Sequence, residues 1–349
     1  MLPLVNNEFN SSTIYNPRSD AGFFDLYYPS PSPPIVKDWN QQSDYGMHLH
    51  PWQQYYFDYG VTGIPKTNSK LPFPDEDKFY LSKGFGEDAC FIRKDSLGVA
   101  DGVGGWRKVK GANSAFFSRN LMHFACQELS KLESLDYNSS QSPAEGGVYL
   151  SPCEQRLFYH QVDPIKILEN SYRLAIESAS SYKIKGSSTA CIVILRNNEL
   201  RIANLGDCGV VVLRDGVVIF QTLEQQHSFN FPYQLGTNSK DRPKDAQYYS
   251  YSVEKGDVIV MGSDGLFDNL FLSDIEEEVT KWKPDFDWVY DTNLSHALAA
   301  RACKVSQQTT TNQSTPFEER AKKEGIKFQG GKRDDITVLV AVVAPQAQD

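Results

Sequence analysis

Residues 188–221 read STACIVILRNNELRIANLGDCGVVVLRDGVVIFQ and contain four short runs of β-branched and aliphatic residues. Turn signals separate them, with Asn197-Asn198 between the first two runs and Asp215-Gly216 between the last two. Runs of this length between such turns are typical of strands joined by hairpins. We therefore predict one antiparallel meander of four strands: Ser188–Leu195, Glu199–Leu205, Gly209–Leu213 and Val217–Gln221.

Further strands and helices are predicted on both sides of this meander. Apolar runs predict strands at Ala89–Ile92, Ser96–Asp101, Tyr248–Val253, Asp257–Met261 and Ile336–Val343. Apolar residues at helical spacing predict helices at Ala112–Leu132, Pro164–Tyr182, Ser273–Trp282, Ser295–Val305 and Pro316–Glu324. We expect loops at 136–154 and 224–246. Strands and helices are segregated rather than strictly alternating, which favours an α+β fold over a doubly wound sheet.

The first 75 residues differ from the rest of the chain. They are polar and rich in Tyr and Phe, are interrupted by several prolines, and show no sustained helical or strand period. We predict that residues 1–75 form an N-terminal extension that wraps the surface of a domain at 76–345, because aromatic side chains usually bury large areas. His48 and His50 could touch a metal, but two histidines without further ligands are more often packing or solvent-facing residues.

Composition excludes several classes of protein. The 349 residues carry a net charge of −9, which argues against a nucleic-acid partner. No run of about 18 apolar residues is present, so we expect no transmembrane segment. The six cysteines are dispersed without a Cys-x-x-Cys pair, which argues against a zinc site or a disulfide framework. The N-terminal residues show neither a secretory signal nor a transit peptide.

Acidic residues stand beside glycine or beside each other at the ends of the predicted strands: Glu87-Asp88, Asp101-Gly102, Asp207, Asp264-Gly265 and Asp334-Asp335. A single Asp-Gly is usually a turn, and we interpret Asp215-Gly216 as a hairpin. Mg²⁺ and Mn²⁺ prefer carboxylate and carbonyl oxygens, and glycine lets a backbone carbonyl approach closely. Converging carboxylates would repel one another unless cations neutralised them. If these side chains converge, they predict a divalent metal centre.

Six motifs occur in the order of the type 2C, metal-dependent protein phosphatases: Gly86–Ala89, Val99–Trp106, Gly186–Ala190, Asn204–Asp207, Gly262–Asp268 and Asp334–Val338. The chain resembles that family over roughly residues 80–343. The forms ADGVGGW, from Ala100, and GGKRDDIT, from Gly330, resemble the branch with mitochondrial members in fungi, plants and animals. The resemblance thus points to the mitochondrion, with the cytoplasm as the alternative.

The resemblance implies a four-layer αββα sandwich, in which helices flank two antiparallel sheets and two Mn²⁺ or Mg²⁺ ions lie at one end. Asp101 would bridge both ions, Gly102 would offer its carbonyl, Asp264 and Asp334 would complete the shell of one ion, and Glu87 would act on the other. Asp207 and Asp268 match positions of a weaker third metal site. Asp88 and Asp335 stand next to ligands, where structural roles are expected.

The reaction implied is hydrolysis of phosphoserine or phosphothreonine in proteins by direct attack of a metal-bridging hydroxide. Cys208 is then a buried small residue rather than a nucleophile. Two residues depart from the family pattern. Val103 stands where many members have a histidine that protonates the leaving group. Lys83 stands where many have a phosphate-binding arginine, and it offers no bidentate fork.

These departures keep two alternatives open. One is a phosphoprotein-binding regulatory module with weakened catalysis. The other is a metal hydrolase that acts on nucleotides or small phosphate esters. Metal-dependent turnover of phosphopeptides separates both from the leading interpretation.

Overall fold

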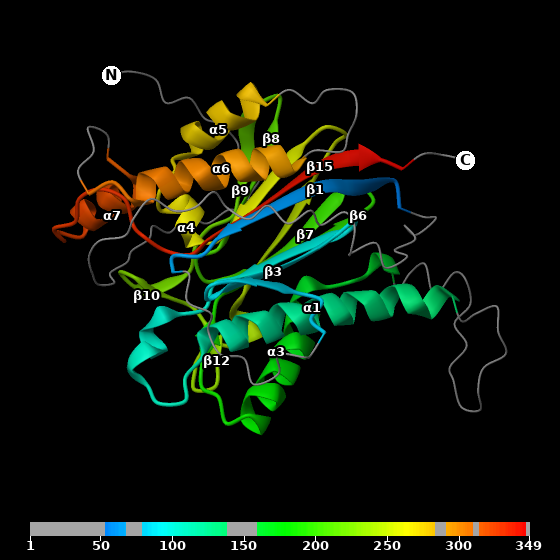
Figure 1. Ribbon diagram of the computed structural model, residues 1–349. Coiled ribbons are helices and arrows are strands. Elements are labelled where there is room, and N and C mark those ends of the chain that lie inside the picture. Colours follow the sequence, from blue (N-terminus) through cyan, green and yellow to red (C-terminus); the bar gives the residue numbers. More distant parts are fainter. Residues whose placement is uncertain (1–52, 68–78, 138–158, 283–290, 310–313, 347–349) are drawn as a thin grey trace, which may run out of the picture.

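Two antiparallel β-sheets pack face to face, and helices cover the outer face of each (Figure 1). This computed structural model describes residues 53–67, 79–137, 159–282, 291–309 and 314–346. One sheet has, in order, β1 (Tyr55–Ile64), β15 (Ile336–Pro345), β14 (Val258–Gly262), β8 (Gly209–Arg214) and β9 (Val217–Gln221). The other has β13 (Gln247–Ser252), β7 (Glu199–Leu205), β6 (Ala190–Arg196), β4 (Ser96–Ala100), β3 (Asp88–Arg93) and β2 (Lys83–Phe85).

The central strands are buried on both faces, which explains their unbroken apolar runs. In β6, Cys191, Val193 and Leu195 lie in the core between the two sheets. Ala190, Ile192 and Ile194 alternate with them and face the helices on the other side. A strand covered on both faces needs no polar side to meet water.

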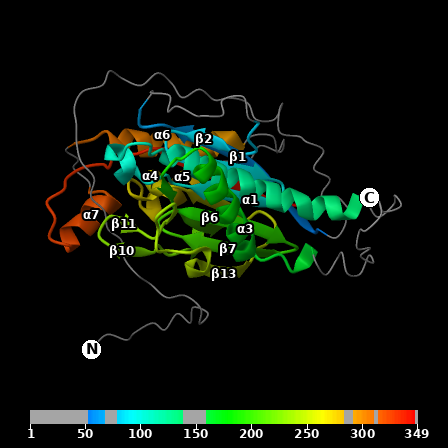
Figure 2. The ribbon, with the colours of Figure 1, turned by 90° about the horizontal axis from the view of Figure 1, so that it is seen from below.

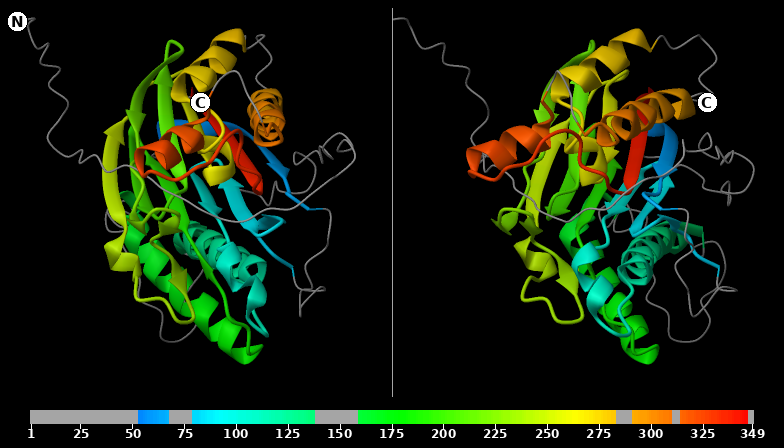
Figure 3. Two further views of the ribbon diagram at one scale, coloured as in Figure 1. Left: turned by 90° about the vertical axis from the view of Figure 1, so that its left-hand side faces the viewer. Right: turned by 60° about the vertical axis from the view of Figure 1, so that its left-hand side comes forward.

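Two long helices cover the six-stranded sheet, as Figures 2 and 3 show. They are α1 (Ser114–Tyr137), whose Phe116 and Phe117 are fully buried, and α3 (Pro164–Ser181). The first turn of α3 is fixed by Pro164 and by Asp163, whose side chain accepts a hydrogen bond from the Ile165 N–H.

Shorter helices cover the five-stranded sheet: α4 (Asp264–Phe267), α5 (Leu272–Lys281) and α6 (Asp291–Ser306). A further helix, α7 (Pro316–Lys323), lies beside α4 (Figure 1). The fold is the predicted α+β sandwich of four layers. Among the described helices, none has both the length and the apolar character needed to cross a membrane.

The expectation that residues 1–75 contain no strand is wrong for Tyr55–Ile64. This segment pairs with β15 along its whole length, and Phe57 is buried between the sheets opposite Val343. Most of its other side chains are half-exposed, and Gly60 and Gly63 interrupt its apolar pattern, so its periodicity is weak. The first sheet therefore begins inside the predicted extension. His48 and His50 lie outside the described residues.

The four strands of 188–221 do not form one meander. The predicted hairpins at Asn197 (φ 55°) and Asp215-Gly216 (φ 51° and 80°) are confirmed, but β7 and β8 belong to different sheets. Gly206, with φ 101°, turns the chain from one sheet to the other at Asp207. A Cβ at Gly206 would lie 2.6 Å from the Tyr233 carbonyl oxygen. A tight crossover between sheets reads in the sequence like a hairpin turn.

One predicted strand is divided, and two predicted loops contain regular structure. Predicted strand 188–195 is divided into β5 (Ser187–Ser188) and β6. Predicted loop 224–246 contains β10 (Gln226–Ser228), β11 (Phe231–Pro232), β12 (Leu235–Gly236) and the 3-10 helix η4 (Pro243–Asp245). Predicted loop 136–154 begins as the last turn of α1, and residues 138–154 lie outside the described residues. The 3-10 helix η2 (Gly104–Lys108) follows the first predicted aspartate-glycine motif.

Candidate metal centre

The predicted acidic residues meet at one edge of both sheets. In the five-stranded sheet, Gly262 pairs with both Val338 and Gly209, so Asp264, Asp334 and Asp207 leave the same edge. In the six-stranded sheet, Ala89 pairs with Ala100, which places Glu87 beside Asp101. Antiparallel pairing thus brings together side chains that lie up to 247 positions apart in the chain, from Glu87 to Asp334.

The carboxylates lie close enough for the charge of one to raise the pKa of another. Burial raises the pKa of Asp101 well above its ordinary value, and the charges of Asp264, Asp88, Asp334 and Asp207 raise it further. Burial also raises the pKa of Asp264, to about 7, although the Lys332 ammonium opposes this rise. Carboxylates collected in this way need positive charge to stay ionised together.

Two buried aspartates tie the sheets to each other at this edge. Asp88, in β3, accepts a hydrogen bond from the Thr337 hydroxyl of β15 at 2.8 Å. Asp335 accepts hydrogen bonds from the backbone N–H of Glu87 at 3.0 Å and of Lys66 at 2.7 Å. The positions of Glu87 and Asp334 relative to each other therefore depend on these two neighbours.

The backbone of Asp101 is fixed by the strand that follows Gly186. Its N–H donates to the Thr189 hydroxyl at 3.0 Å, and its carbonyl accepts from the Thr189 N–H at 2.9 Å and the Ser188 hydroxyl at 2.8 Å. The Asp101 carboxylate accepts no hydrogen bond from a described residue. The side chain is thus aimed by its backbone while its oxygens remain available.

Two lysines that the sequence analysis did not select lie inside the acidic group. Lys66 Nζ is 2.6 Å from Asp334 Oδ1, 3.0 Å from Glu87 Oε2 and 3.1 Å from Asp335 Oδ2. Burial alone would lower the pKa of Lys66, but these carboxylates raise it above its ordinary value. Lys332 Nζ contacts Asp264 Oδ2 and lies 2.7 Å from Asp268 Oδ2. Each ammonium group stands where the carboxylates attract a cation.

The donor atoms suit a hard divalent cation. As they stand, no three Asp, Glu, His or Cys side chains of the described residues are arranged to hold a metal ion, and ammonium groups lie among the carboxylates instead. The buried oxygen Asp264 Oδ1 has no hydrogen-bond donor among the described residues. Carboxylate oxygens without sulfur or imidazole nitrogen are the ligands that Mg²⁺ and Mn²⁺ prefer. The group could therefore hold such ions at the Asp264 oxygen that accepts no hydrogen bond and, once the Lys66 ammonium gives way, at Asp334 and Glu87.

The other residues singled out in the sequence are placed as follows. Lys83 lies in the edge strand β2 opposite Cys90, whereas Lys66 and Lys332 contact the acidic group. Val103 caps η2, and its carbonyl accepts from the Ser114 hydroxyl at 2.7 Å. Cys208 is fully buried, and burial raises the pKa of its thiol well above the ordinary value. A protonated, inaccessible thiol does not act as a nucleophile.

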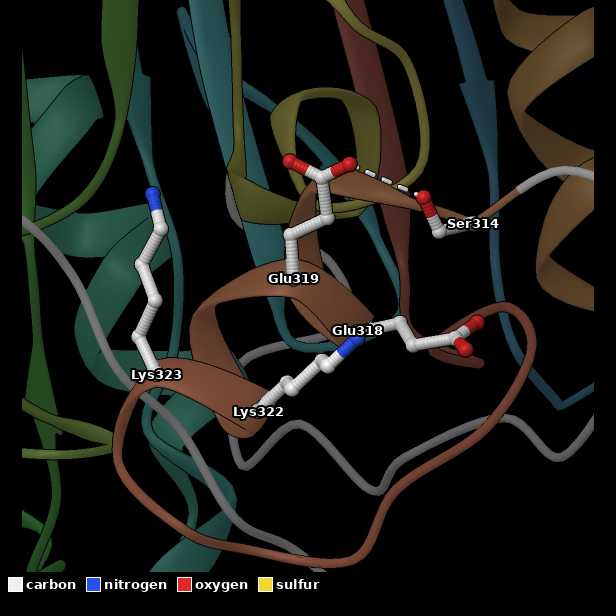
Figure 4. Close-up of a pocket in the computed structure, with 5 residues that line it drawn as sticks. All are labelled: Ser314, Glu318, Glu319, Lys322 and Lys323. Atoms are coloured by element: carbon white, nitrogen blue, oxygen red, sulfur yellow. Dashed lines mark hydrogen bonds between the residues drawn. The ribbon is translucent and has the colours of Figure 1, made fainter.

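A surface hollow of about 450 Å³ lies on α7 (Figure 4). Its lining side chains carry both charges: Ser314, Glu318, Glu319, Lys322 and Lys323. The Ser314 hydroxyl donates to Glu319 Oε1 at 2.9 Å. None of the predicted metal ligands lines this hollow.

Gly102 is expected to tolerate no side chain. A Cβ there would lie 3.0 Å from Ser114 O and closer still to Glu87 O, and both are backbone atoms that cannot swing away. We expect Gly102→Ala to reduce the free energy of unfolding by about 1–3 kcal/mol, because overpacking displaces the Glu87 turn. Chemical denaturation measures this loss.

Gly84→Ala is the matched control, because its Cβ would meet only Arg119 Cδ at 3.6 Å and Asp88 O at 3.7 Å. Its effect should stay within about 1 kcal/mol. Equal effects of the two substitutions would show that the space around Gly102 is not restrictive.

Known proteins resemble this chain in both sequence and fold. Residues 150–344 match the family model described as Stage II sporulation protein E (SpoIIE). The chain is 36% identical over 283 residues to the probable protein phosphatase 2C 80 of Arabidopsis thaliana. It is 37% identical over 287 residues to the protein phosphatase PTC7 homolog of Homo sapiens, with 77% of this chain and 84% of that relative covered. The chain belongs to the type 2C protein phosphatase family.

A solved structure supports the same type 2C assignment. The X-ray structure of the photosystem II phosphatase PBCP matches with a TM-score of 0.60 and 30% identity, covering 82% of this chain and 98% of that one. The chain spans 57% and 51% of the length of two type 2C relatives from Arabidopsis thaliana, the probable protein phosphatases 2C 80 and 2C 55.

Proposed function

We propose that this protein is a metal-dependent phosphatase that hydrolyses phosphoserine and phosphothreonine in proteins. The observation that carries the proposal is the convergence of carboxylates from separate strand ends around the half-buried Asp101, with oxygen atoms as donors. Membership of the type 2C family supports it.

In this proposal Asp101, Asp264, Asp334 and Glu87 would hold Mn²⁺ or Mg²⁺ through their carboxylates, and Gly102 would contribute its carbonyl oxygen. When bound, such ions would lower the pKa of water enough to supply hydroxide for attack on phosphorus, and they would neutralise charge on the phosphoryl oxygens. The buried, undonated oxygen of Asp264 supports its part in this set.

The chain's own residues orient the proposed metal ligands. Thr189 and Ser188 fix the Asp101 backbone, while Asp335 fixes that of Glu87. Val103 has no proton to donate, so the departing serine or threonine oxygen must take any proton from water or from another side chain. The activity should therefore lack the histidine-dependent pH limb that general acid catalysis produces.

A substrate panel tests this function. Phosphate release from phosphoserine, phosphothreonine and phosphotyrosine peptides, a nucleotide and a nucleic acid should be measured with Mn²⁺ or Mg²⁺ and again with chelator. The proposal expects metal-dependent turnover of the first two. Tight phosphopeptide binding without turnover would favour the regulatory module, and turnover of the nucleotide alone would favour the small-ester hydrolase.

The mitochondrial location is proposed on the resemblance of the sequence motifs to the mitochondrial branch of the family. Fractionation of cells that express the full chain tests it. Recovery in the cytosolic fraction alone would contradict it.

A further inference from the structure

Asp268 differs from the other carboxylates because both of its oxygens are already bound to protein cations. Oδ1 accepts from the Arg320 guanidinium, and Oδ2 lies 2.7 Å from Lys332 Nζ. The side chain is buried, at 2% exposure. In Asp264, by contrast, only Oδ2 contacts Lys332, and Oδ1 accepts no hydrogen bond from a described residue. A metal ion at Asp268 would have to displace one of two cations.

The backbone around Asp268 holds both cations in place. The Phe317 N–H of α7 donates to the Asp268 carbonyl at 3.0 Å, which sets Arg320 one turn further along the helix. On the other side, Asn269 and Lys332 exchange two hydrogen bonds of 2.9 Å between the Asn269 amide and the Lys332 backbone. Asp268 and Asn269, which follow α4, thus bind the backbone of both segments that carry the two cations.

The segment that carries Arg320 is itself anchored. Thr315 caps α7 by accepting from the Glu318 N–H at 3.1 Å, and its hydroxyl donates to the Gly330 carbonyl at 2.8 Å. Glu318 in turn accepts from the Gly330 N–H at 2.9 Å. Phe317, 2% exposed, packs against Phe328 beneath these bonds. The backbone segments that carry Arg320 and Lys332 are therefore anchored to each other and to α4.

We propose that the Arg320–Asp268–Lys332 triad takes the place of a third metal ion, so that this centre binds two divalent cations and Asp268 is a structural anchor. The inference rests on the proposed function. A buried carboxylate between two cations has its negative charge neutralised, and each of its two oxygens already contacts a positive group. The same two positive charges repel an approaching divalent ion. This revises the expectation that Asp207 and Asp268 form a weaker metal site.

Manganese stoichiometry tests this inference without reference to activity. Equilibrium dialysis with electron paramagnetic resonance of free Mn²⁺ should give two ions per chain for the full-length protein, even at millimolar Mn²⁺. Asp268→Asn should also bind two, whereas Asp264→Asn should lose at least one. Because Asp268→Asn could unfold the chain, the wild-type stoichiometry and Arg320→Met provide independent measurements.

The converse variant should create the missing site. Arg320→Met combined with Lys332→Met removes both cations and frees the Asp268 carboxylate, so this variant should gain one Mn²⁺ per chain. Three ions in the wild type, falling to two in Asp268→Asn, would overturn the triad but leave the proposed function intact. No bound Mn²⁺ in the wild type would overturn both.

Discussion

Replacing Asp101 with asparagine should lower kcat/KM for a phosphothreonine peptide by about 10³-fold or more. In our account this carboxylate is the ligand that two ions share, and metal-derived stabilisation of several kcal/mol corresponds to factors of this size. Asparagine keeps the shape and the backbone contacts to Thr189 but removes the charge. Steady-state assays with saturating Mn²⁺ measure the loss. Metal-free thermal stability should not fall, because the substitution removes repulsion among buried carboxylates.

Asp215→Asn is the matched control, since Asp215 also precedes a glycine but lies exposed in the β8–β9 hairpin. Its φ of 51° is one that asparagine adopts readily. Activity should stay at the wild-type level. Undiminished activity in Asp101→Asn would remove this residue from the catalytic centre.

Asp95→Asn should cost about 3–5 kcal/mol of stability, the range found when a buried ion pair loses one partner. Asp95 lies in the β3–β4 turn, at the opposite end of β3 from the acidic group, 3.1 Å from Arg93 Nε and 2.9 Å from an Arg196 guanidinium nitrogen. Arg93 and Arg196 are 0% and 2% exposed. The amide would remove the negative charge that Asp95 places between two buried guanidinium groups. Urea denaturation at neutral pH measures the change.

The pH dependence of this loss follows from the pKa of Asp95. Burial alone would raise that pKa, but Arg93 and Arg196 lower it to about 2. A carboxylate whose pKa is lowered in the folded state stabilises the fold at pH values above its ordinary pKa of about 4. This contribution is lost as the pH falls through about 2. The difference between wild type and Asp95→Asn should therefore shrink over that interval.

Glu177→Gln is the control for carboxylate removal, because its partner Arg173 is equally exposed on α3. An exposed pair of this kind contributes about 0.5 kcal/mol or less. A difference for Asp95→Asn that is as small as this, or that stays constant with pH, would contradict the role assigned to the buried network.

Local pattern predicted the strands well, because chain segments buried on both faces are unambiguous. Strands Glu199–Leu205 and Val217–Gln221 end at the predicted residues. Strand β1 was missed because its pairing partner lies at the other end of the chain and its half-exposed tyrosines obscure its buried positions. The sheet that a strand joins depends on tertiary packing. The local pattern at Gly206-Asp207 therefore predicts a meander, although the chain crosses there between sheets.

The acidic residues were found by their position beside glycine at strand ends, and the structure brings them together. Lys66 and Lys332 were missed for a physical reason. A lysine near an acidic motif is usually solvated, and only the fold shows that these two point inward. Lys66 also follows the strand that the sequence pattern concealed. Metal ligation by each carboxylate stays a prediction.

Crystals of the protein grown with Mn²⁺ and measured at the manganese absorption edge would show whether the carboxylates hold metal. We expect two anomalous peaks that share Asp101, with Asp264 and Asp334 on one, Glu87 near the other, and the Lys66 ammonium displaced from Asp334. An acidic group without manganese, with Lys66 still bound to Asp334, would refute the proposed metal centre.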